Sequence, residues 1–210
     1  MEWDRAATLP EPLGNPRLVT AGSRLYALFA MDHTGSYQSG LHLVISVRIS
    51  RDGGLTWSEP KQIATWPTGG YSGTGQLFAA ADDRGTLWAV VPVRGTVRIW
   101  SSRDHTTWTE TKYIAPQVYS PRPGTSYNYW KSRLWQCGPD MYRLSFVAAD
   151  QTVWWAASQD GQRWGPPSVL SPVKHAANVA SAGSDAAWVV HGNSLVRLRP
   201  CATGAKAADK

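Results

Sequence analysis

Short stretches of the chain alternate apolar and polar residues, and Gly, Pro and Asp stand between them. We assign alternation to 25–29 and 41–47 from the apolar residues Leu25, Ala27 and Phe29 and from Leu41, Leu43, Ile45 and Val47. Because successive side chains of a strand point to opposite faces, this pattern predicts half-buried β-strands. The predicted strands are 16–20, 24–31, 41–49, 61–66, 76–81, 86–93, 96–100, 112–115, 133–137, 141–148, 153–157, 168–170, 179–182, 186–191 and 194–199.

A polar motif recurs after three of these strands. The first copy is Ser50-Arg51-Asp52-Gly53-Gly54-Leu55-Thr56-Trp57, and the next two begin 52 and 56 residues further on, at 102 and then at 158. Recurrence at about 50 residues predicts a repeat architecture. The residues that define the motif are Ser50, Asp52, Gly54 and Trp57, then Ser102, Asp104 and Trp108, then Ser158, Asp160 and Trp164.

The motif has the chemistry of a tight hairpin turn. Ser and Asp oxygens accept hydrogen bonds from the backbone N–H groups of their own turn, so we expect Asp52 and Asp160 to do so. Glycine supplies the positive φ that such turns need. The second copy has His105 and Thr106 where glycines are usual, which predicts a strained or differently shaped turn. The motif's Trp is expected to lie largely buried beneath its turn.

These residues resemble the Asp-box, or BNR repeat, of the sialidase family, whose pattern is S-x-D-x-G-x-T-W. The first copy fits the pattern in full, and the third lacks only the second Gly and the Thr. The resemblance implies a β-propeller in which each box joins the third and fourth strands of a blade. It also implies that the boxes lie on the face opposite the binding site.

The strands then group into an all-β, four-bladed β-propeller of four-stranded antiparallel blades. The segment that starts at Trp3 looks like the segment that starts at Trp57, directly after the first box. We therefore expect residues 3–9 to complete the last blade by pairing with 194–199, which closes the ring and removes two exposed sheet edges. The expected blades are 13–67, 75–116, 131–171, and 178–200 with 1–12, in a single domain of residues 1–201 that a flexible tail of 202–210 follows.

Composition narrows the picture further. Twelve Trp stand against three Phe, and nineteen Gly with fourteen Pro suit many turns. The formal charge is +6, but the Arg residues are scattered, so we expect no nucleic-acid partner. The two cysteines, Cys137 and Cys201, do not form a disulfide framework. No apolar run reaches the roughly 18–20 residues of a membrane span, and no signal peptide is evident, which leaves secretion and the cytoplasm both open. We expect a monomer without a cofactor or metal.

The loops between blades hold the candidate binding residues. Residues 119–131 form the richest loop, with four aromatic side chains, two cations and an Asn. Aromatic faces beside amide and guanidinium donors suit sugar rings, although the same aromatics could instead cover the propeller's core. The candidate ligand-binding residues are Arg122, Tyr127, Tyr129, Trp130 and Lys131, with a second group of Tyr71, Tyr37 and His33.

The resemblance also implies a sialidase catalytic set, and here the sequence departs from the family. Gly14 stands where the first substrate-binding Arg belongs, and Arg17 is displaced by three positions. The loop 33–40 holds no carboxylate for the acid/base role, and Asp32 at its edge is the only substitute. The four glutamates, which are Glu2, Glu11, Glu59 and Glu110, do not lie in a late inter-blade loop. The other carboxylates considered for a catalytic pair mostly fall at hairpin turns, and they are Asp82, Asp83, Asp140 and Asp150.

The sequence therefore predicts a non-catalytic, sialidase-like propeller that binds a glycan or protein ligand on its loop face, with carbohydrate as the first choice. A glycoside hydrolase of sialidase type with an atypical site is the alternative. A protein-interaction domain of a larger protein is the third possibility.

Overall fold

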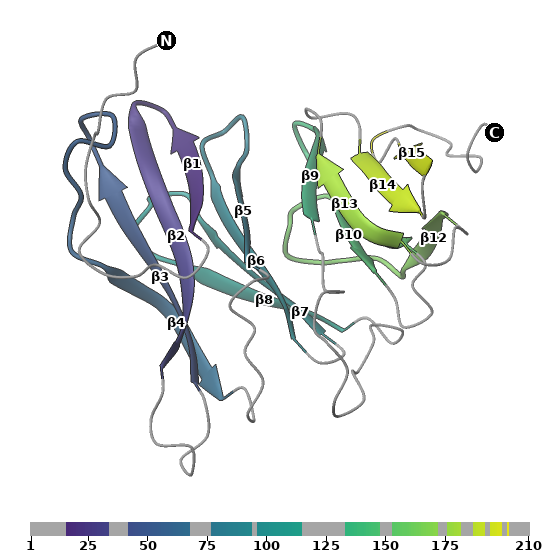
Figure 1. Cartoon of the computed structure of the whole chain (residues 1–210), viewed down its shortest axis with the longest axis horizontal. Helices are drawn as coiled ribbons and strands as arrows, with labels where there is room; N and C mark the ends of the chain where they lie inside the picture. The colour runs from purple at the N-terminus through teal and green to yellow at the C-terminus, as the bar shows by residue number, and fades with distance from the viewer. Residues whose placement is uncertain are drawn as a thin grey trace. The chain divides into compact units, whose positions relative to one another are not determined.

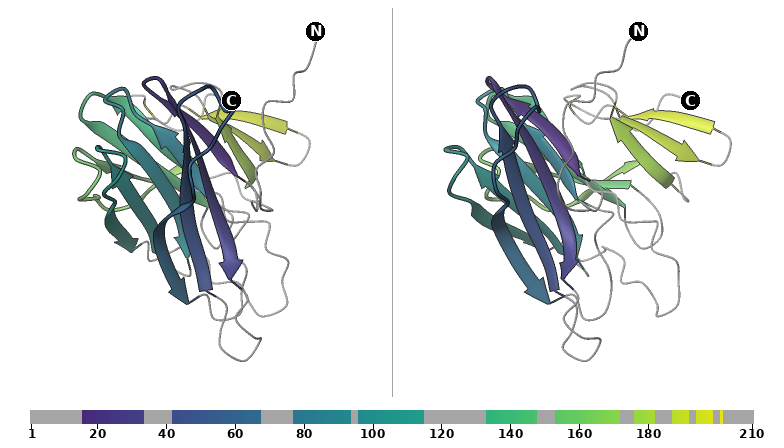
Figure 2. Two further views of the ribbon diagram at one scale, coloured as in Figure 1. Left: turned by 90° about the vertical axis from the view of Figure 1, so that its left-hand side faces the viewer. Right: turned by 60° about the vertical axis from the view of Figure 1, so that its left-hand side comes forward.

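A computed structural model shows the chain as an all-β protein (Figure 1). It describes residues 16–33, 42–67, 77–93, 96–114, 133–147, 153–171, 176–181, 187–191, 194–198 and 201. Fifteen strands in these residues form three four-stranded sheets and one three-stranded sheet. Within each sheet the strands neighbour one another in chain order, and they run side by side in every view (Figure 2).

The first two sheets come from the N-terminal half of the chain. The first sheet contains β1 (Arg17–Ala21), β2 (Arg24–His33), β3 (His42–Ser50) and β4 (Lys61–Pro67). The second sheet contains β5 (Phe78–Ala81), β6 (Leu87–Val93), β7 (Thr96–Ser102) and β8 (Thr109–Ile114).

The other two sheets follow. The third sheet contains β9 (Arg133–Gly138), β10 (Met141–Val147), β11 (Val153–Ser158) and β12 (Ser168–Ser171). The fourth sheet contains β13 (Ala176–Ser181), β14 (Ala187–His191) and β15 (Ser194–Leu198). All fifteen predicted strands are present, and their ends lie within three residues of the predicted ends. The strand expected in residues 1–12 and the tail 202–210 lie outside the described residues.

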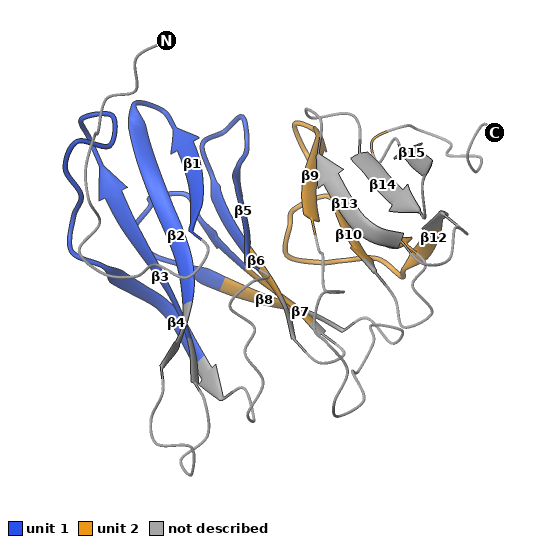
Figure 3. Ribbon diagram, viewed as in Figure 1, with its two compact units in different colours: residues 1–89, 100–109 blue, residues 90–99, 110–210 orange. Residues whose placement is uncertain are grey.

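The chain divides into two compact units (Figure 3). One unit contains residues 1–89 and 100–109, and the other contains 90–99 and 110–210. The boundary between them runs through the strands of the second sheet. The third and fourth sheets both belong to the second unit.

The second strand of each of the first three sheets is the centre of its core. Residues 26–30 of β2, 87–91 of β6 and 142–146 of β10 are buried without a break. Since neighbouring residues of a strand point to opposite faces, both faces of these strands are covered. The expectation of half-buried strands was therefore wrong for these three. Residues 25–31 and 87–91 are unbroken apolar runs, which is the pattern of a strand covered on both faces, so the sequence carries this signal for β2 and β6.

Two arginines are also buried in this core, and each has a partner for its charge or its N–H groups. Arg48 Nη1 on β3 donates to the carbonyl oxygen of Ser58 at 3.0 Å. The guanidinium of Arg143 on β10 lies 4.3 Å from the ring centroid of Trp155 on β11, which is a cation–π contact. Within the described residues, no helix has the length and apolar character needed to cross a membrane.

Candidate functional site

Three turns, named here the Ser-x-Asp turns, follow the third strands of the first three sheets. They are residues 50–57, 102–108 and 158–164, and each begins at the last residue of its strand. In the first turn, Ser50 Oγ accepts the N–H of Gly54 at 2.8 Å and donates to Asp52 Oδ1 at 2.7 Å. Asp52 in turn accepts the N–H of Thr56 at 2.9 Å and its hydroxyl at 2.5 Å.

The second and third turns are one residue shorter and use their Asp in the same way. Asp104 Oδ1 accepts the N–H groups of Thr106 and Thr107 at 2.8 and 2.7 Å. Asp160 Oδ1 accepts two N–H groups, each at 2.8 Å, from the residues two and three positions after it. The backbone bonds expected for Asp52 and Asp160 are therefore present in the structure.

Hydrogen bonds of this kind favour the charged form of a carboxylate. The hydroxyl and then the N–H of Thr56 lower the pKa of Asp52 to about 2. The N–H groups of Thr107 and Thr106 hold the pKa of Asp104 well below its usual range. The N–H groups at the end of the third turn likewise lower the pKa of Asp160. All three side chains are ionised at neutral pH, so they are acceptors and cannot act as proton donors there.

The residue after each Asp has a left-handed backbone. The φ angles are 72° at Gly53, 62° at His105 and 70° at Gly161. Glycine adopts such angles without strain, but a residue with a Cβ does so at a cost of about 1–2 kcal/mol. His105 is the only non-glycine residue at positive φ in the described part of the chain. The strain predicted for the second turn is thus at His105.

The ring of His105 has two hydrogen-bond partners outside its own turn. The hydroxyl of Tyr26 lies 2.5 Å from Nδ1, and the carbonyl oxygen of Gly85 lies 2.8 Å from Nε2. A carbonyl can only accept, so Nε2 carries a hydrogen, and in the neutral ring the Tyr26 hydroxyl donates to Nδ1. The two rings meet edge to face, with centroids 5.0 Å apart. Tyr26 is on β2 and fully buried, so this ring joins the second sheet to the first.

Two further bonds connect a Ser-x-Asp turn to the outer strand of the preceding sheet. Lys61 Nζ at the start of β4 donates to the carbonyl oxygen of Thr106 at 2.7 Å. The hydroxyl of Thr111 near the start of β8 donates to Oε1 of Gln162. Thr106 and Gln162 each stand two residues after the Asp of their turn. These turns therefore have a second structural role, which is to link neighbouring sheets.

The Trp residues of the turns are covered as expected. Trp57, Trp108 and Trp164 are each largely but not fully buried. Trp57 does fold back under its turn, because its Nε1 donates to the carbonyl oxygen of Gly54 at 3.1 Å.

Another carboxylate has a structural role in the hairpin that joins β5 and β6. Asp82 Oδ1 accepts the N–H groups of Arg84 at 3.0 Å and Thr86 at 2.8 Å. Its Oδ2 accepts the indole N–H of Trp88 at 3.1 Å. Asp82 was one of the carboxylates considered for a catalytic pair, and these bonds occupy both of its oxygens.

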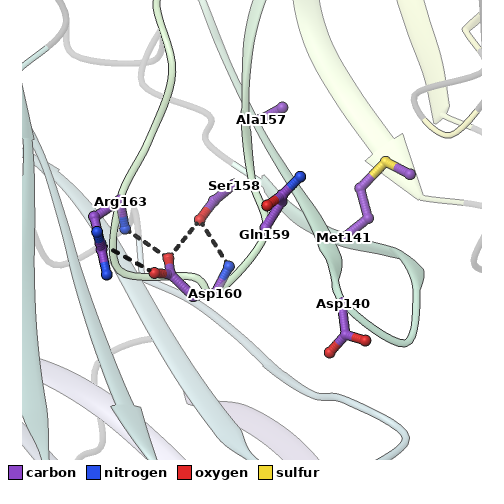
Figure 4. Close-up of a pocket in the computed structure, with 7 residues that line it drawn as sticks. All are labelled: Asp140, Met141, Ala157, Ser158, Gln159, Asp160 and Arg163. Atoms are coloured by element: carbon purple, nitrogen blue, oxygen red, sulfur yellow. Dashed lines mark hydrogen bonds and ion pairs between the residues drawn. The ribbon is translucent and has the colours of Figure 1, made fainter.

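An open hollow of about 920 Å³ lies beside the third Ser-x-Asp turn (Figure 4). Its wall combines carboxylate, amide, guanidinium and thioether groups. Arg163 is 94% exposed, and its Nε lies 3.4 Å from Asp160 Oδ2. Such a wall could bind a polar molecule through the amide of Gln159 and the guanidinium of Arg163. The lining residues are Asp140, Met141, Ala157, Ser158, Gln159, Asp160 and Arg163.

Sequence reasoning did not select this hollow, because its turn residues were assigned to the fold. The sequence signal for it was the polar hairpin at Asp140, which brings a carboxylate close to the third turn. No group of three or more His, Cys, Asp or Glu side chains that could hold a metal ion is found among the residues that the structure describes.

The predicted ligand-binding residues lie almost entirely outside the described residues. This holds for Arg122, Tyr127, Tyr129, Trp130, Lys131, Tyr71 and Tyr37. His33 is the last residue of β2, and its backbone pairs with His42. Arg17, the displaced arginine near the family's first Arg position, donates from Nε to the carbonyl oxygen of Leu77 at 2.8 Å. Arg17 therefore joins β1 to the segment before β5.

No family model and no curated protein matches this chain. Solved structures do match it at low identity. A Hadza microbial sialidase, Hz136, has a TM-score of 0.53 and 17% identity over 87% of this chain and 43% of its own. NanB in complex with Optactamide has a TM-score of 0.53 and 17% identity over 74% of this chain and 26% of its own.

A third solved structure is the α-L-arabinanase of Penicillium chrysogenum in complex with arabinobiose. It has a TM-score of 0.53 and 16% identity over 90% of this chain and 62% of its own. The chain thus spans between 26% and 62% of the length of these three proteins. At such identity the likeness concerns the fold, which is that of the sialidase-like β-propellers.

The bonds from the His105 ring to Tyr26 and Gly85 predict that a substitution of His105 destabilises the fold. His105→Gly removes the left-handed strain, which alone would stabilise the fold by about 1–2 kcal/mol. It also removes both ring bonds and leaves the buried Tyr26 hydroxyl without its acceptor, at a cost of about 1–3 kcal/mol for that group alone. We expect a net loss in thermal denaturation. In a double-mutant cycle, Tyr26→Phe and His105→Gly should be less than additive. A raised melting temperature in His105→Gly would contradict the bridge.

The lowered carboxylate pKa values predict acid sensitivity. The folded-state pKa of Asp52 is about 2 and the ordinary value is 3.8, so the unfolded chain binds the proton first as the pH falls. The stability that Asp52 contributes is present above about pH 4 and is lost between about pH 4 and 2. Asp52→Asn should therefore destabilise the protein most at neutral pH, and the difference should shrink towards pH 2. Urea unfolding at a series of pH values measures this. A difference that does not change with pH would exclude a carboxylate-specific role.

Proposed function

We propose that this chain is a sialidase-like propeller module that binds carbohydrate through its inter-blade loops and has no catalytic residues. The observation that carries the proposal is the fold likeness to a sialidase and to an arabinanase with bound arabinobiose. In folds of this kind, loops on a rigid scaffold are the usual place for binding residues.

The loop 119–131 is the proposed contact region. Tyr127, Tyr129 and Trp130 offer three aromatic faces for the C–H side of a sugar ring. Arg122 and Lys131 offer N–H donors for hydroxyl or carboxylate oxygens. Tyr71, Tyr37 and His33 belong to other segments of the same proposed face. Stacking of this kind needs no arginine triad, so it is compatible with Gly14 at the family's first Arg position.

The absence of catalysis is supported by the roles of the carboxylates. Asp52, Asp104 and Asp160 accept hydrogen bonds inside the Ser-x-Asp turns, and Asp82 does so in a hairpin. The sequence of the loop 33–40 contains no carboxylate, and the four glutamates do not lie in a late inter-blade loop. A general acid and its partner are therefore missing from the positions that the resemblance assigns to them.

The proposed architecture is a single domain of residues 1–201 with four blades. The Ser-x-Asp turns are its Asp-boxes, and residues 3–9 pair with 194–199 to complete the fourth blade and close the ring. Two findings support this proposal. The strand order repeats in three four-stranded sheets, and three turns at the same place in each repeat have a left-handed residue directly after their Asp.

A glycoside hydrolase with an atypical site is the second candidate, because the matching sialidase and arabinanase are enzymes. A protein-interaction domain is a third. Within the described residues, the large exposed apolar side chains are Leu18, Leu55 and Val169, which lie on β1, in the first turn and on β12. They are scattered over different elements, which does not favour a large apolar contact surface.

If sugars bind through the loop 119–131, a substitution of Trp130 should abolish sugar binding. Titration calorimetry with arabino-oligosaccharides and with sialyl-oligosaccharides should show binding by the intact chain, and Trp130→Ala should abolish it. Trp130→Phe should keep part of the affinity, because a stacking face is retained. Gln159→Ala in the hollow beside the third turn is the matched control and should bind as the parent does.

If Gln159→Ala abolishes binding and Trp130→Ala does not, the binding site is the hollow beside the third turn. No binding of either class of sugar would contradict the proposed function. Release of product from a fluorogenic sialoside or arabinofuranoside, with loss of this activity in Asp32→Ala, would replace the proposal by the hydrolase alternative.

If residues 3–9 close the ring, their removal should destabilise the protein. Deletion of residues 1–10 should expose an edge strand of the fourth blade, and the truncated chain should aggregate or melt at a clearly lower temperature. Size-exclusion chromatography and thermal denaturation measure these effects. A melting curve equal to that of the full chain would count against a closed ring.

A further inference from the structure

A disulfide stands in the fourth sheet at the position where the other sheets have a Ser-x-Asp turn. β3, β7 and β11 end at Ser50, Ser102 and Ser158, where the turns begin. β15 ends at Leu198, and residues 199–210 contain no Ser-x-Asp sequence. The register of this pair differs by one residue, because Ser50 pairs with the second residue of β2 and Leu198 with the first residue of β14.

The alignment places Cys201 at a particular position. It is three residues after the end of its strand, as are Gly53, His105 and Gly161 in the three turns. In the second sheet this position holds His105, whose ring reaches Tyr26 of the preceding sheet. In the fourth sheet it holds Cys201, whose sulfur is bonded to Cys137 of β9 in the preceding sheet. Counted from the end of the third strand, the same position thus carries a link to the preceding sheet in both cases.

The bond corrects the sequence analysis, which gave no pairing of the two cysteines. The Cα atoms of Cys137 and Cys201 lie 4.9 Å apart, within the usual range for a disulfide, although the residues are 64 positions apart in the chain. Both residues are half-buried. Two cysteines with this separation carry no sequence signal for pairing, because only the fold brings them together.

We propose that the Cys137–Cys201 disulfide is a redox-dependent latch that fastens the fourth sheet to the third. It takes the place of the hydrogen-bonded links that Lys61 and Thr111 make to the second and third turns. To form it, the two thiols lose two protons and two electrons to a small-molecule disulfide oxidant, which is reduced to two thiols. With the bond formed, the segment between the two cysteines, which contains β10 to β15, is a closed loop.

The latch has consequences for stability and for the place where the chain works. Closing a loop of this length removes conformational entropy from the unfolded chain, which favours the folded state. Cytosolic glutathione and thioredoxin reduce accessible disulfides. The latched form therefore belongs to an oxidising compartment, and the fourth sheet is the part of the fold that depends on it.

The test compares the full chain with and without reductant. The chain is prepared with oxidised glutathione, and mass spectrometry of a non-reduced digest should find the peptides of Cys137 and Cys201 linked. Dithiothreitol should lower the melting temperature by roughly 10 °C for a domain of this size. Limited proteolysis should then cut first between residues 172 and 201, while the fragment that contains the first two sheets survives.

The double variant Cys137→Ser/Cys201→Ser is the matched control. It should melt where the reduced chain melts and should not respond to dithiothreitol. If this variant does not fold, the comparison of the parent with and without reductant still decides the question. Two free thiols in the oxidised preparation, or a parent whose melting and cleavage pattern do not change on reduction, would overturn the proposal.

Discussion

The carboxylate at the centre of each Ser-x-Asp turn is the interaction on which the repeated structure depends. A chain built from short antiparallel strands must reverse direction often, and each reversal leaves backbone N–H groups without strand partners. Asp52, Asp104 and Asp160 accept these groups, and the Ser that ends each strand fixes the carboxylate in place. The next residue then adopts a left-handed backbone in all three sheets, and the first turn adds one residue, with a second left-handed glycine at Gly54.

In the second turn, a strained backbone at His105 accompanies side-chain contacts with other parts of the fold. A histidine at a left-handed position is strained, and a glycine would relieve that strain. The strain is compensated because the ring of His105 joins the buried Tyr26 to the carbonyl of Gly85. Lys61 and Thr111 reach the second and third turns from the preceding sheets. The turns therefore organise both the hairpins and the contacts between neighbouring sheets, which explains why polar residues at a surface corner recur in the sequence.

The parts of this structure that the sequence predicted are those that local residues determine. The fifteen strands follow from short alternating or apolar stretches and from Gly, Asp and Pro at the turns, and the bonds of Asp52 and Asp160 follow from the motif itself. The continuous burial of β2 is also encoded locally, because residues 25–31 are an unbroken apolar run. The bridge from His105 to Tyr26 and the bond from Cys201 to Cys137 join residues 79 and 64 positions apart. The candidate site was predicted mainly from residues 119–131, which lie outside the described part of the chain.

The turn carboxylates stabilise the fold and do not take part in acid catalysis. A carboxylate that accepts several N–H groups and has a lowered pKa stays ionised near neutral pH, so it cannot serve there as a general acid. Asp52 and its equivalents are thus committed to the scaffold, and a general acid must come from other segments. The loops between sheets can then change without disturbing the turns. This division accounts for a fold that is shared with a sialidase and an arabinanase at 16–17% identity, where the scaffold is alike although most residues differ.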